Sequence, residues 1–317
     1  MRNVFVINPK SGNGRASRRL IRNIRSAGSK NNQVCEIYLT KGPGDAERFI
    51  KAYLKHWSEE QVRLYMCGGD GTVNEGVDAL MHLATESGQL PSAALGVVPV
   101  GSGNDFLRSF TNHKEARDIE KQLRAKPAYC DVLRITGQIE GEEKTLYCDN
   151  ILNIGFDCDT VDTTNRLRSN PLILPSFSYA IGALVTLIKK RGVRMHMEAE
   201  EGTLYDGKLL LTCIGNGSYC GGGMKTNPMA SLHDGIMDIN LVKDISRLRF
   251  LMLFPLYMKG KHMQKKGIEK YIRTEKTSRV KITPLDGKMR ICIDGETCDA
   301  GEITVETIKD AFRILIP

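Results

Sequence analysis

The sequence lacks the patterns of several common functional classes. Its nine cysteines form no Cys-x-x-Cys pair, which argues against a zinc knuckle or a small disulfide framework. The motifs G-x-x-x-x-G-K-[ST], G-x-G-x-x-G and H-E-x-x-H are also absent, so we expect no P-loop, dinucleotide fingerprint or zinc protease site. Aromatic residues make up only 6% of the chain, with no basic-aromatic motif, so nucleic-acid binding is not expected. Scattered thiols in a chain of 317 residues are typical of a reducing cytoplasm.

Acidic residues are missing from the start of the chain. Residues 1–30 hold eight Lys or Arg and no Asp or Glu, within a formal net charge of +8. A targeting peptide can have this composition, but VFVIN at 4–8 reads as a buried strand before a loop and a helix, so we predict folded structure. A second basic tract, residues 259–281, has nine Lys or Arg against two acids. It is either a solvated face or a surface that attracts phosphate on a nucleotide or a membrane.

Long hydrophobic runs are scarce. Residues 171–188 form an uncharged run of 18, the lower limit for a helix that spans a bilayer, but Pro175, Gly182 and several hydroxyl residues dilute it. We predict a core helix here, with a lipid-facing helix as the second interpretation. The run at 250–258 contains Pro255 and is interpreted in the same way. No transmembrane span is expected, and the protein is predicted to be cytoplasmic.

Two kinds of pattern divide the chain. Up to about residue 125, strand-like runs at 4–8, 34–40, 62–68 and 94–100 alternate with helical ones such as 45–57 and 72–85, which predicts a parallel sheet with helices on both faces. After Asp131, β-like runs dominate, interrupted by helical stretches near 176–190 and 246–263. We therefore predict an α/β fold with a doubly wound N-terminal nucleotide-binding domain (1–128 plus 305–317) and a mostly antiparallel β-sandwich domain (129–304).

Three loops rich in glycine follow predicted strands of the first domain. They are NPKSGNG at 8–14, CGGDGTVNEG at 67–76 and VPVGSGNDF at 98–106. Glycine lets the backbone approach a bulky group, and N–H groups at the start of a helix favour anions. A single such loop is most simply a tight turn. Three loops at neighbouring strand ends predict a shared phosphate site in the crevice typical of doubly wound sheets, with Asp70 and Asp105 facing it.

These loops and motifs further along the chain carry a resemblance to a known family. In order, they are NPKSG (8–12), GGDGT (68–72), GSGND (101–105), GGGMK (221–225), HDG (233–235) and DGE (294–296). The set resembles the soluble bacterial diacylglycerol kinase family, within the diacylglycerol and sphingosine lipid-kinase superfamily, over nearly the whole chain. GGDG alone also occurs in NAD kinases, so the specificity comes from the asparagine-proline loop, the G-x-x-N-D loop and the late DGE together.

The resemblance implies a nucleotide site for ATP. The residues it implies there are Asn8, Pro9, Lys10, Ser11, Gly12, Thr40, Gly68, Gly69, Asp70, Gly71, Thr72, Val73, Asn74 and Ser102. The family usually has threonine where this chain has Ser102, and serine keeps the hydroxyl. Asp70, Asp105 and Asp131 are implied to organise Mg²⁺ and water around the phosphates.

The resemblance also implies roles in the second domain. Glu296 matches the proposed general base, which takes the proton from the acceptor hydroxyl, and Asp294 would orient it or share the metal shell. The carboxylate of Asp234 with the carbonyl groups of Ser231 and Ile236 matches a structural Mg²⁺ site, although many relatives have a second acid where this chain has His233. From the residues alone, DGE could instead be only a hairpin turn, since Asp-Gly is a favoured turn pair.

The acceptor is predicted to be diacylglycerol, phosphorylated to phosphatidic acid at an anionic membrane surface; the protein would then be peripherally membrane-associated. Apolar stretches at 172–188 and 248–258 would line an acyl groove or belong to the core, and ceramide, a sphingoid base or another glycerolipid remains an alternative acceptor. Two other functions stay open: an NAD kinase, and a non-catalytic nucleotide- or membrane-binding protein on the same scaffold. Homodimers occur in the family, but the sequence shows no interface.

Overall fold

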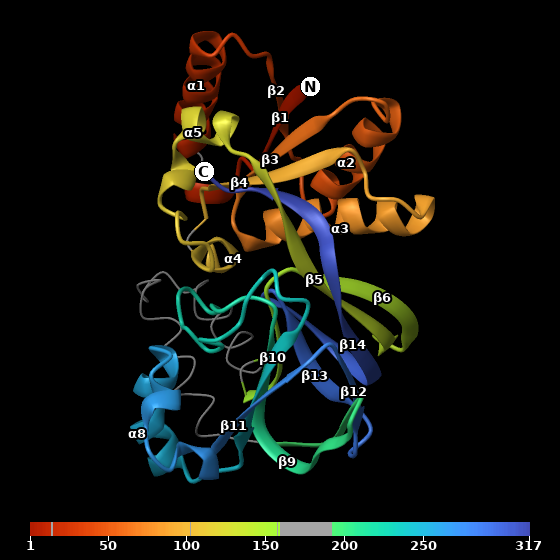
Figure 1. Ribbon diagram of the computed structural model, residues 1–317, viewed down its shortest axis with the longest axis vertical. Helices are drawn as coiled ribbons and strands as arrows, with labels where there is room; N and C mark the ends of the chain where they lie inside the picture. The colour runs from red at the N-terminus through yellow and green to blue at the C-terminus, as the bar shows by residue number, and fades with distance from the viewer. Residues whose placement is uncertain (14, 102, 157, 159–191) are drawn as a thin grey trace. The chain divides into compact units, whose positions relative to one another are not determined.

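The computed structural model describes residues 1–13, 15–101, 103–156, 158 and 192–317 (Figure 1). The chain forms two compact units, Met1–Val132 with Lys309–Pro317, and Leu133–Ile308. It passes from one unit to the other inside two continuous strands, β5 (Pro127–Ile139) and β14 (Glu296–Leu315). The predicted boundaries at 128 and 304 fall slightly before the observed ones at 132 and 308, because each passage lies within a strand and no change of composition marks it.

The first unit contains a parallel sheet. Its remaining elements are β1 (Arg2–Ile7), η1 (Ser11–Asn13), α1 (Arg15–Lys30), β2 (Cys35–Leu39), α2 (Asp45–His56), β3 (Val62–Gly68), α3 (Asp70–Ser87), β4 (Ala93–Pro99), α4 (Asp105–Arg108), η2 (Glu115–Arg117) and α5 (Ile119–Arg124). The strands lie in the order β2-β1-β3-β4-β14, each paired in parallel with its neighbour. This confirms the doubly wound prediction, and the strand order reverses between β1 and β3.

Helices cover both faces of this sheet (Figure 1). Phe5 and Tyr65 belong to a buried cluster with Ile24 of α1 and Leu123 of α5. Successive strand residues point to opposite faces, so Met66 faces the other side, where α3 lies: a Cβ added at Gly76 would come within 3.0 Å of its side chain. Helix α2 packs against α3. Burial on both faces explains why β3 and β4 are nearly continuous apolar runs.

The second unit is a mostly antiparallel β structure, as predicted. Its remaining elements are β6 (Glu142–Cys148), β7 (Ile151–Gly155), β8 (Val193–Ala199), β9 (Gly202–Gly215), β10 (Met237–Lys243), α8 (Arg247–Met258), η3 (His262–Gln264), η4 (Ile268–Lys270), β11 (Ile272–Thr277), β12 (Arg279–Pro284) and β13 (Met289–Ile293). Paired strands of this unit form a closed circuit, which runs β7-β9-β8-β12-β14-β13 and back to β7. Long strands β9 and β14 change partners along their length, as strands at sandwich corners do.

Two apolar clusters stabilise this unit. One lies among the strands of the circuit and includes Ile154, Leu209, Ile282 and Ile291, all fully buried. The other lies where α8 packs beside β7, β9 and β10, with Phe250, Leu253 and Tyr257 of α8 buried. The predicted helix near 246–263 is therefore shorter than expected. The predicted helices at 171–190 lie outside the described residues.

Two local predictions needed correction. One of the β-like runs after Asp131, KTLYCDNILNIGF at 144–156, reads in the sequence as a single strand but forms two strands separated by Asp149 and Asn150. Strand β11 was not predicted at all. Among the described residues, no helix has both the length and the apolar composition needed to cross a membrane.

Candidate active site

The first two glycine-rich loops meet at the position where the strand order reverses. Asn8 follows β1, and its backbone N–H donates to the carbonyl oxygen of Cys67 at 3.0 Å. Its side-chain amide donates to the hydroxyl of Thr72 at 3.3 Å. Thr40 lies beside them, because its N–H donates to the carbonyl oxygen of Ile7 at 2.9 Å. The carboxyl ends of β1, β2 and β3 are thus joined where doubly wound sheets bind ligands.

The remainder of the first loop is a tight turn held by Asn8. Its side-chain oxygen accepts the N–H of Lys10 at 3.0 Å, and its carbonyl accepts that of Ser11 at 3.1 Å. Gly12 has a φ of 63°, a left-handed conformation that glycine adopts without steric cost. The turn therefore depends on Asn8, which accepts both N–H groups, and on the glycine at position 12.

Close backbone approach joins the second loop to the third. The N–H groups of Val100 and Gly101 donate to the carbonyl oxygen of Gly68 at 2.9 and 3.0 Å. A Cβ added at Gly101 would lie 2.5 Å from the Cα of Gly69, nearer than any real side chain is found. A Cβ at Gly68 would lie 2.2 Å from the Thr72 hydroxyl. The glycines are therefore required for the three loops to form one continuous surface.

Helix α3 presents its amino end to this surface. Its N-cap is Gly69, which has no side chain to accept the first N–H groups of the helix. Such groups and the helix dipole favour an anion. Val73 and Asn74, in the same turn, are buried and half-buried, and Gly71 is exposed. The second loop thus has the local geometry of a phosphate-binding turn.

Asp70 and Asp105 lie together at this edge. A Cβ added at Gly103 would be 2.8 Å from Oδ2 of Asp70 and 3.7 Å from Oδ2 of Asp105. The other oxygen of Asp70 accepts the N–H of Phe106 at 3.3 Å, and Arg108 approaches Oδ1 of Asp105 at 3.4 Å. Two carboxylates beside a glycine are the hard oxygen donors that Mg²⁺ prefers, so these residues fit the predicted metal.

Other predicted residues lie elsewhere. Asp131 is fully buried on β5, where its carboxylate accepts the N–H of Asp310 from β14 at 2.8 Å. Ser102 lies outside the described residues. A residue that the sequence did not single out, Glu75 of α3, accepts the N–H groups of Gly44 and Ala46, each at 3.0 Å. It fixes the start of α2 next to the loop that carries Thr40. Its position shortly after the GGDGT loop, near the start of α3, is the sequence signal that could have identified it.

The DGE motif forms a hairpin. Asp294 and Gly295 connect β13 to β14 with φ values of 48° and 97°, the positive pair that a two-residue type I′ turn requires. The Asp294 carboxylate accepts the N–H groups of Asp149 at 2.9 Å and Ile151 at 2.8 Å. Burial raises the pKa of Asp294, and these hydrogen bonds oppose the rise. The turn interpretation is thus correct for the backbone, and Asp294 anchors the hairpin to the start of β7.

Glu296 is the exposed member of this hairpin. It is the first residue of β14, opposite Ile293 in the ladder. Its carboxylate faces solvent while Asp294 is bound to backbone. The hairpin therefore divides its two acids into one that holds structure and one that is available to a ligand.

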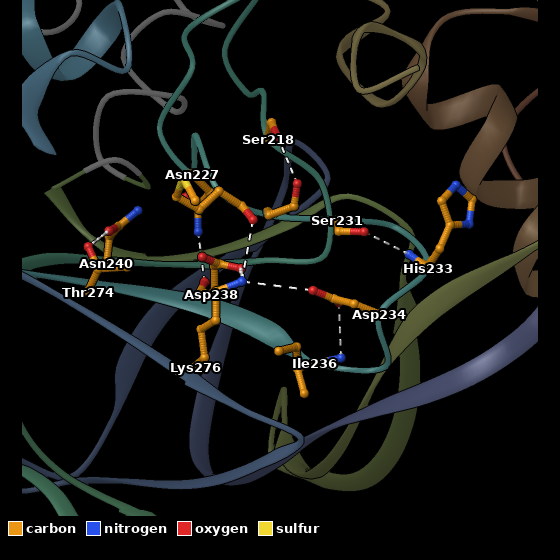
Figure 2. Close-up of polar contacts among 12 residues, drawn as sticks. Ser218, Asn227, Ser231, His233, Asp234, Ile236, Asp238, Asn240, Thr274 and Lys276 are labelled. Carbon is orange, nitrogen blue, oxygen red and sulfur yellow. Dashed lines mark hydrogen bonds and ion pairs between the residues drawn. The ribbon is translucent and has the colours of Figure 1, made fainter. Parts of the chain in front are cut away.

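The predicted metal loop around Asp234 contains an ammonium group as well as oxygen donors (Figure 2). Asp234 accepts the N–H of Ile236 at 3.3 Å, and the Ser231 hydroxyl accepts the N–H of His233 at 3.4 Å. Lys276 lies 3.1 Å from Oδ2 of the buried Asp238 and 3.8 Å from Oδ2 of Asp234. The oxygens suit Mg²⁺, whereas the charge of Lys276 opposes a second cation. A metal here stays a prediction.

Asp238, beside this loop, is an acid whose pKa is changed by burial. Asp238 is 1% exposed, and burial raises the pKa of its carboxyl, against the lowering effect of Lys276. Within the part of the chain that the structure describes, no group of three or more His, Cys, Asp or Glu side chains could hold a metal ion. Two or fewer acids, with main-chain or water ligands, would therefore have to suffice at either predicted metal site.

Two family models match the chain. The diacylglycerol kinase catalytic domain matches residues 2–135. The YegS C-terminal NAD kinase beta sandwich-like domain matches residues 150–316. Together they account for the parallel α/β unit and for most of the antiparallel unit.

Curated relatives are similar over most or all of the chain. A probable lipid kinase YegS-like protein of Xanthomonas axonopodis pv. citri is 26% identical over 317 residues, covering 99% of this chain and 95% of its own. A diacylglycerol kinase of Bacillus subtilis is 29% identical over 234 residues, covering 72% of this chain and 69% of its own. The first of these spans both units.

Solved structures show the same fold. A putative diacylglycerol kinase from Bacillus anthracis has a TM-score of 0.74 and 19% identity, with 100% of this chain and 97% of that chain covered. A yeast NADH kinase complexed with NADH has a TM-score of 0.52 and 14% identity, with 99% and 82% covered. At these identities the likeness concerns the fold alone.

Proposed function

Because the chain belongs to the family of the diacylglycerol kinase catalytic domain, followed by the YegS-type C-terminal domain, we propose that it is an ATP-dependent lipid kinase. It transfers the γ-phosphate of ATP to the free hydroxyl of diacylglycerol, and the product is phosphatidic acid. The observation that carries this proposal is the convergence of the asparagine-proline, GGDGT and GSGND loops where the strand order reverses.

In this proposal the first unit binds and orients ATP. The bare backbone of Gly68, Gly69 and Gly101 approaches the phosphates, and the amino end of α3 favours their charge. Asn8 and Thr72, joined by their hydrogen bond, keep two of the loops in register. Asp70 and Asp105 would hold Mg²⁺, which neutralises phosphate charge when bound. Phosphoryl transfer depends mainly on such positioning and charge compensation.

Glu296 acts as the general base. An exposed carboxylate on an anchored hairpin can accept the proton of the acceptor hydroxyl as that oxygen bonds to the γ-phosphorus, while the bond from the γ-phosphorus to the bridging oxygen of ATP breaks and ADP leaves. Asp294 holds the hairpin through the N–H groups of Asp149 and Ile151. Asp294 is therefore a positioning residue in this scheme, and Mg²⁺ bound at Asp234 would serve the fold of that loop.

The NAD kinase alternative is supported by the shared fold with a yeast NADH kinase and by the match of residues 150–316 to an NAD kinase beta sandwich-like domain. Fold does not decide between acceptors. The lipid interpretation is preferred because the asparagine-proline opening and the late DGE motif accompany GGDG here. Sequence similarity to a probable lipid kinase also extends over 99% of the chain at 26% identity.

The experiment follows radiolabelled phosphate from magnesium-ATP. The acceptors are dioleoylglycerol in anionic mixed micelles and, separately, NAD in buffer. Label in phosphatidic acid, lost at least about 100-fold in Glu296→Gln and in Asp70→Asn, is the expected result. Asn preserves the oxygen that accepts the Phe106 N–H, so Asp70→Asn removes charge with little change of shape. Asp286→Asn, which changes an exposed acid paired with Arg194, is the matched control.

The outcomes separate the three functions. Label in NADP alone would replace the lipid proposal with NAD kinase. Protein that is folded and binds ATP but labels neither diacylglycerol, other lipid acceptors nor NAD would be the non-catalytic scaffold. Retained activity in Glu296→Gln would remove Glu296 from the mechanism while leaving the kinase assignment intact.

A further inference from the structure

Helix α8 exposes an apolar stripe. Leu248 is 69% exposed, Leu251 47%, Met252 59% and Met258 36%. These residues follow the spacing i, i+3, i+4 and i+10, so they share one side of the helix. Phe250, Leu253 and Tyr257 occupy the opposite side and are buried against the strands. The helix is therefore apolar on both sides, although only one of them contacts the core.

An exposed apolar surface of this kind needs an explanation. Scattered exposed hydrophobic residues are ordinary, but a contiguous patch marks an interaction site. Met263, 43% exposed in the turn after α8, adds a further apolar side chain close to the end of the helix. A helix that is hydrophobic all round is usually enclosed by protein or by lipid.

Basic side chains surround this stripe in the sequence. Residues 245–274 contain eight Lys or Arg and one acid, Glu269. Within the described chain, five lysines that follow the helix are exposed and form no ion pair: Lys259, Lys261, Lys265, Lys266 and Lys270. Their charges are therefore available to a partner.

The remaining basic residues of the tract at 259–281 form ion pairs. Arg273 pairs with Glu275, Lys276 with Asp238, Arg279 with Glu306 and Lys281 with Glu302. The basic tract that the sequence shows as one run is thus divided by the fold into a neutralised half on β11 and β12 and an uncompensated half beside α8. Only the second half adjoins the apolar stripe along the chain.

We propose that the stripe of α8 and the five lysines after it form a docking surface for an anionic lipid bilayer. The apolar side chains enter the boundary between headgroups and acyl chains, while the lysines contact the negative headgroups, as in interfacial helices with a basic flank. This inference rests on the proposed function, since a kinase of long-chain diacylglycerol must meet its acceptor in a membrane. It adds the element that makes the contact.

Charge complementarity favours a bilayer over a second copy of the chain. Two copies that met through this surface would bring two sets of uncompensated lysines together, and like charges across an interface oppose association. An anionic bilayer satisfies both features of the surface, because it offers an apolar interior and a negative face.

The test is sedimentation of the full chain with vesicles of phosphatidylcholine, alone or mixed with phosphatidylglycerol. Two variants remove one feature each: Leu248→Ser/Leu251→Ser/Met252→Ser, and Lys261→Gln/Lys265→Gln/Lys266→Gln. The control, Arg273→Gln/Arg279→Gln/Lys281→Gln, removes the same number of charges from bases already paired with acids. Thermal unfolding of each variant verifies the fold, which exposed positions should preserve.

Wild-type protein should bind the mixed vesicles more tightly than the neutral ones and lose binding as salt increases. Removal of three lysines should weaken binding about 100-fold, the serine variant should lose it by a similar factor, and the control should stay within a few-fold of wild type. Equal binding by all four folded proteins, or binding indifferent to phosphatidylglycerol, would overturn the proposal.

A second assay keeps this inference separate from the kinase assignment. With a short-chain diacylglycerol dissolved in buffer, the stripe and lysine variants should turn over like wild type, and with long-chain diacylglycerol in anionic vesicles they should not. Vesicle binding that depends on both features in a protein that phosphorylates no lipid would support the docking surface and overturn the proposed function. Kinase activity on vesicles that survives both variants would overturn the docking surface alone.

Discussion

At the scale of single residues, the structure assigns partners that charge counting does not show. Asp238 is almost fully buried on β10, and Lys276 of β11 compensates it at 3.1 Å. The two strands are antiparallel neighbours, with Asp238 directly opposite Lys276 in the ladder. Cross-strand pairing of opposite charges stabilises a sheet, and here it also compensates a carboxylate that burial disfavours.

We predict that Lys276→Met destabilises the protein at neutral pH by about 1–3 kcal/mol, because it leaves a buried acceptor without its partner. Burial already raises the pKa of Asp238, and Lys276 opposes that rise. In the variant the pKa of Asp238 in the folded state rises further above its unfolded value, so the variant should regain stability as the pH falls and lose stability as the pH rises through that folded-state pKa. Urea midpoints at several pH values, in buffer with a chelator, measure this.

The double variant Lys276→Met/Asp238→Asn is the control. With the charge gone, its stability should depend less on pH than that of Lys276→Met. If Lys276→Met has the same urea midpoint as wild type at every pH, the pair contributes nothing and the role given to Lys276 is wrong.

At the scale of elements, the candidate site depends on how closely its loops approach. The backbones at Gly69 and Gly101 approach this closely only because Gly101 has no side chain: a Cβ there would lie 2.5 Å from the Cα of Gly69, whereas a Cβ at Gly69 would lie 3.5 Å from the Cα of Gly101, an ordinary contact. No other residue type fits at Gly101 unless one of the loops moves. The packing of two loops against each other therefore explains a glycine that local turn geometry alone would not require.

We predict that Gly101→Ala destabilises the first unit by about 1–3 kcal/mol, the usual effect of overpacking, and weakens ATP binding by displacing the GGDGT loop. Gly42→Ala is the matched control for stability, because a Cβ there meets no atom within 4 Å. Denaturation midpoints and titration with a fluorescent ATP analogue measure the two effects. Wild-type values of both in Gly101→Ala would show that the loops tolerate separation and would contradict the packing argument.

At the scale of the whole molecule, the first unit is completed by the end of the chain. Residues 309–317 return to it, and Ile314 and Leu315 pair with β4 in parallel. Phe312, Ile314 and Leu315 are at most 2% exposed. The last strand therefore covers what would otherwise be an open edge of the sheet at β4.

We predict that removal of residues 309–317 destabilises the first unit by at least about 5 kcal/mol, since three large apolar side chains leave the core. Hydrogen exchange should show loss of protection first in β4 and β3. Removal of Pro317 alone is the control and should leave exchange unchanged. Normal protection of β4 in the shortened chain would mean that the last strand is dispensable.

Much of the fold and part of the site follow from sequence alone, for a local reason. The strands at 4–8, 62–68 and 94–100 were predicted within two residues, because buried parallel strands are short apolar runs bounded by glycine or proline. The hairpin at Asp294 was available from Asp-Gly by the same logic. Strand β11 was missed because its alternation, IRTEKT, is mostly polar and charged and lies inside a basic tract.

Only the tertiary structure decided which of these local features act together. Strand order places Asn8 beside Thr72, register places Lys276 opposite Asp238, and packing turns one side of α8 inward and leaves the other exposed. The sequence by itself determined the two-unit plan, the glycine loops and the family motifs, because each depends on neighbours along the chain. Partnership between distant residues depends on how the chain closes on itself, and that closure is set by burial of the whole core.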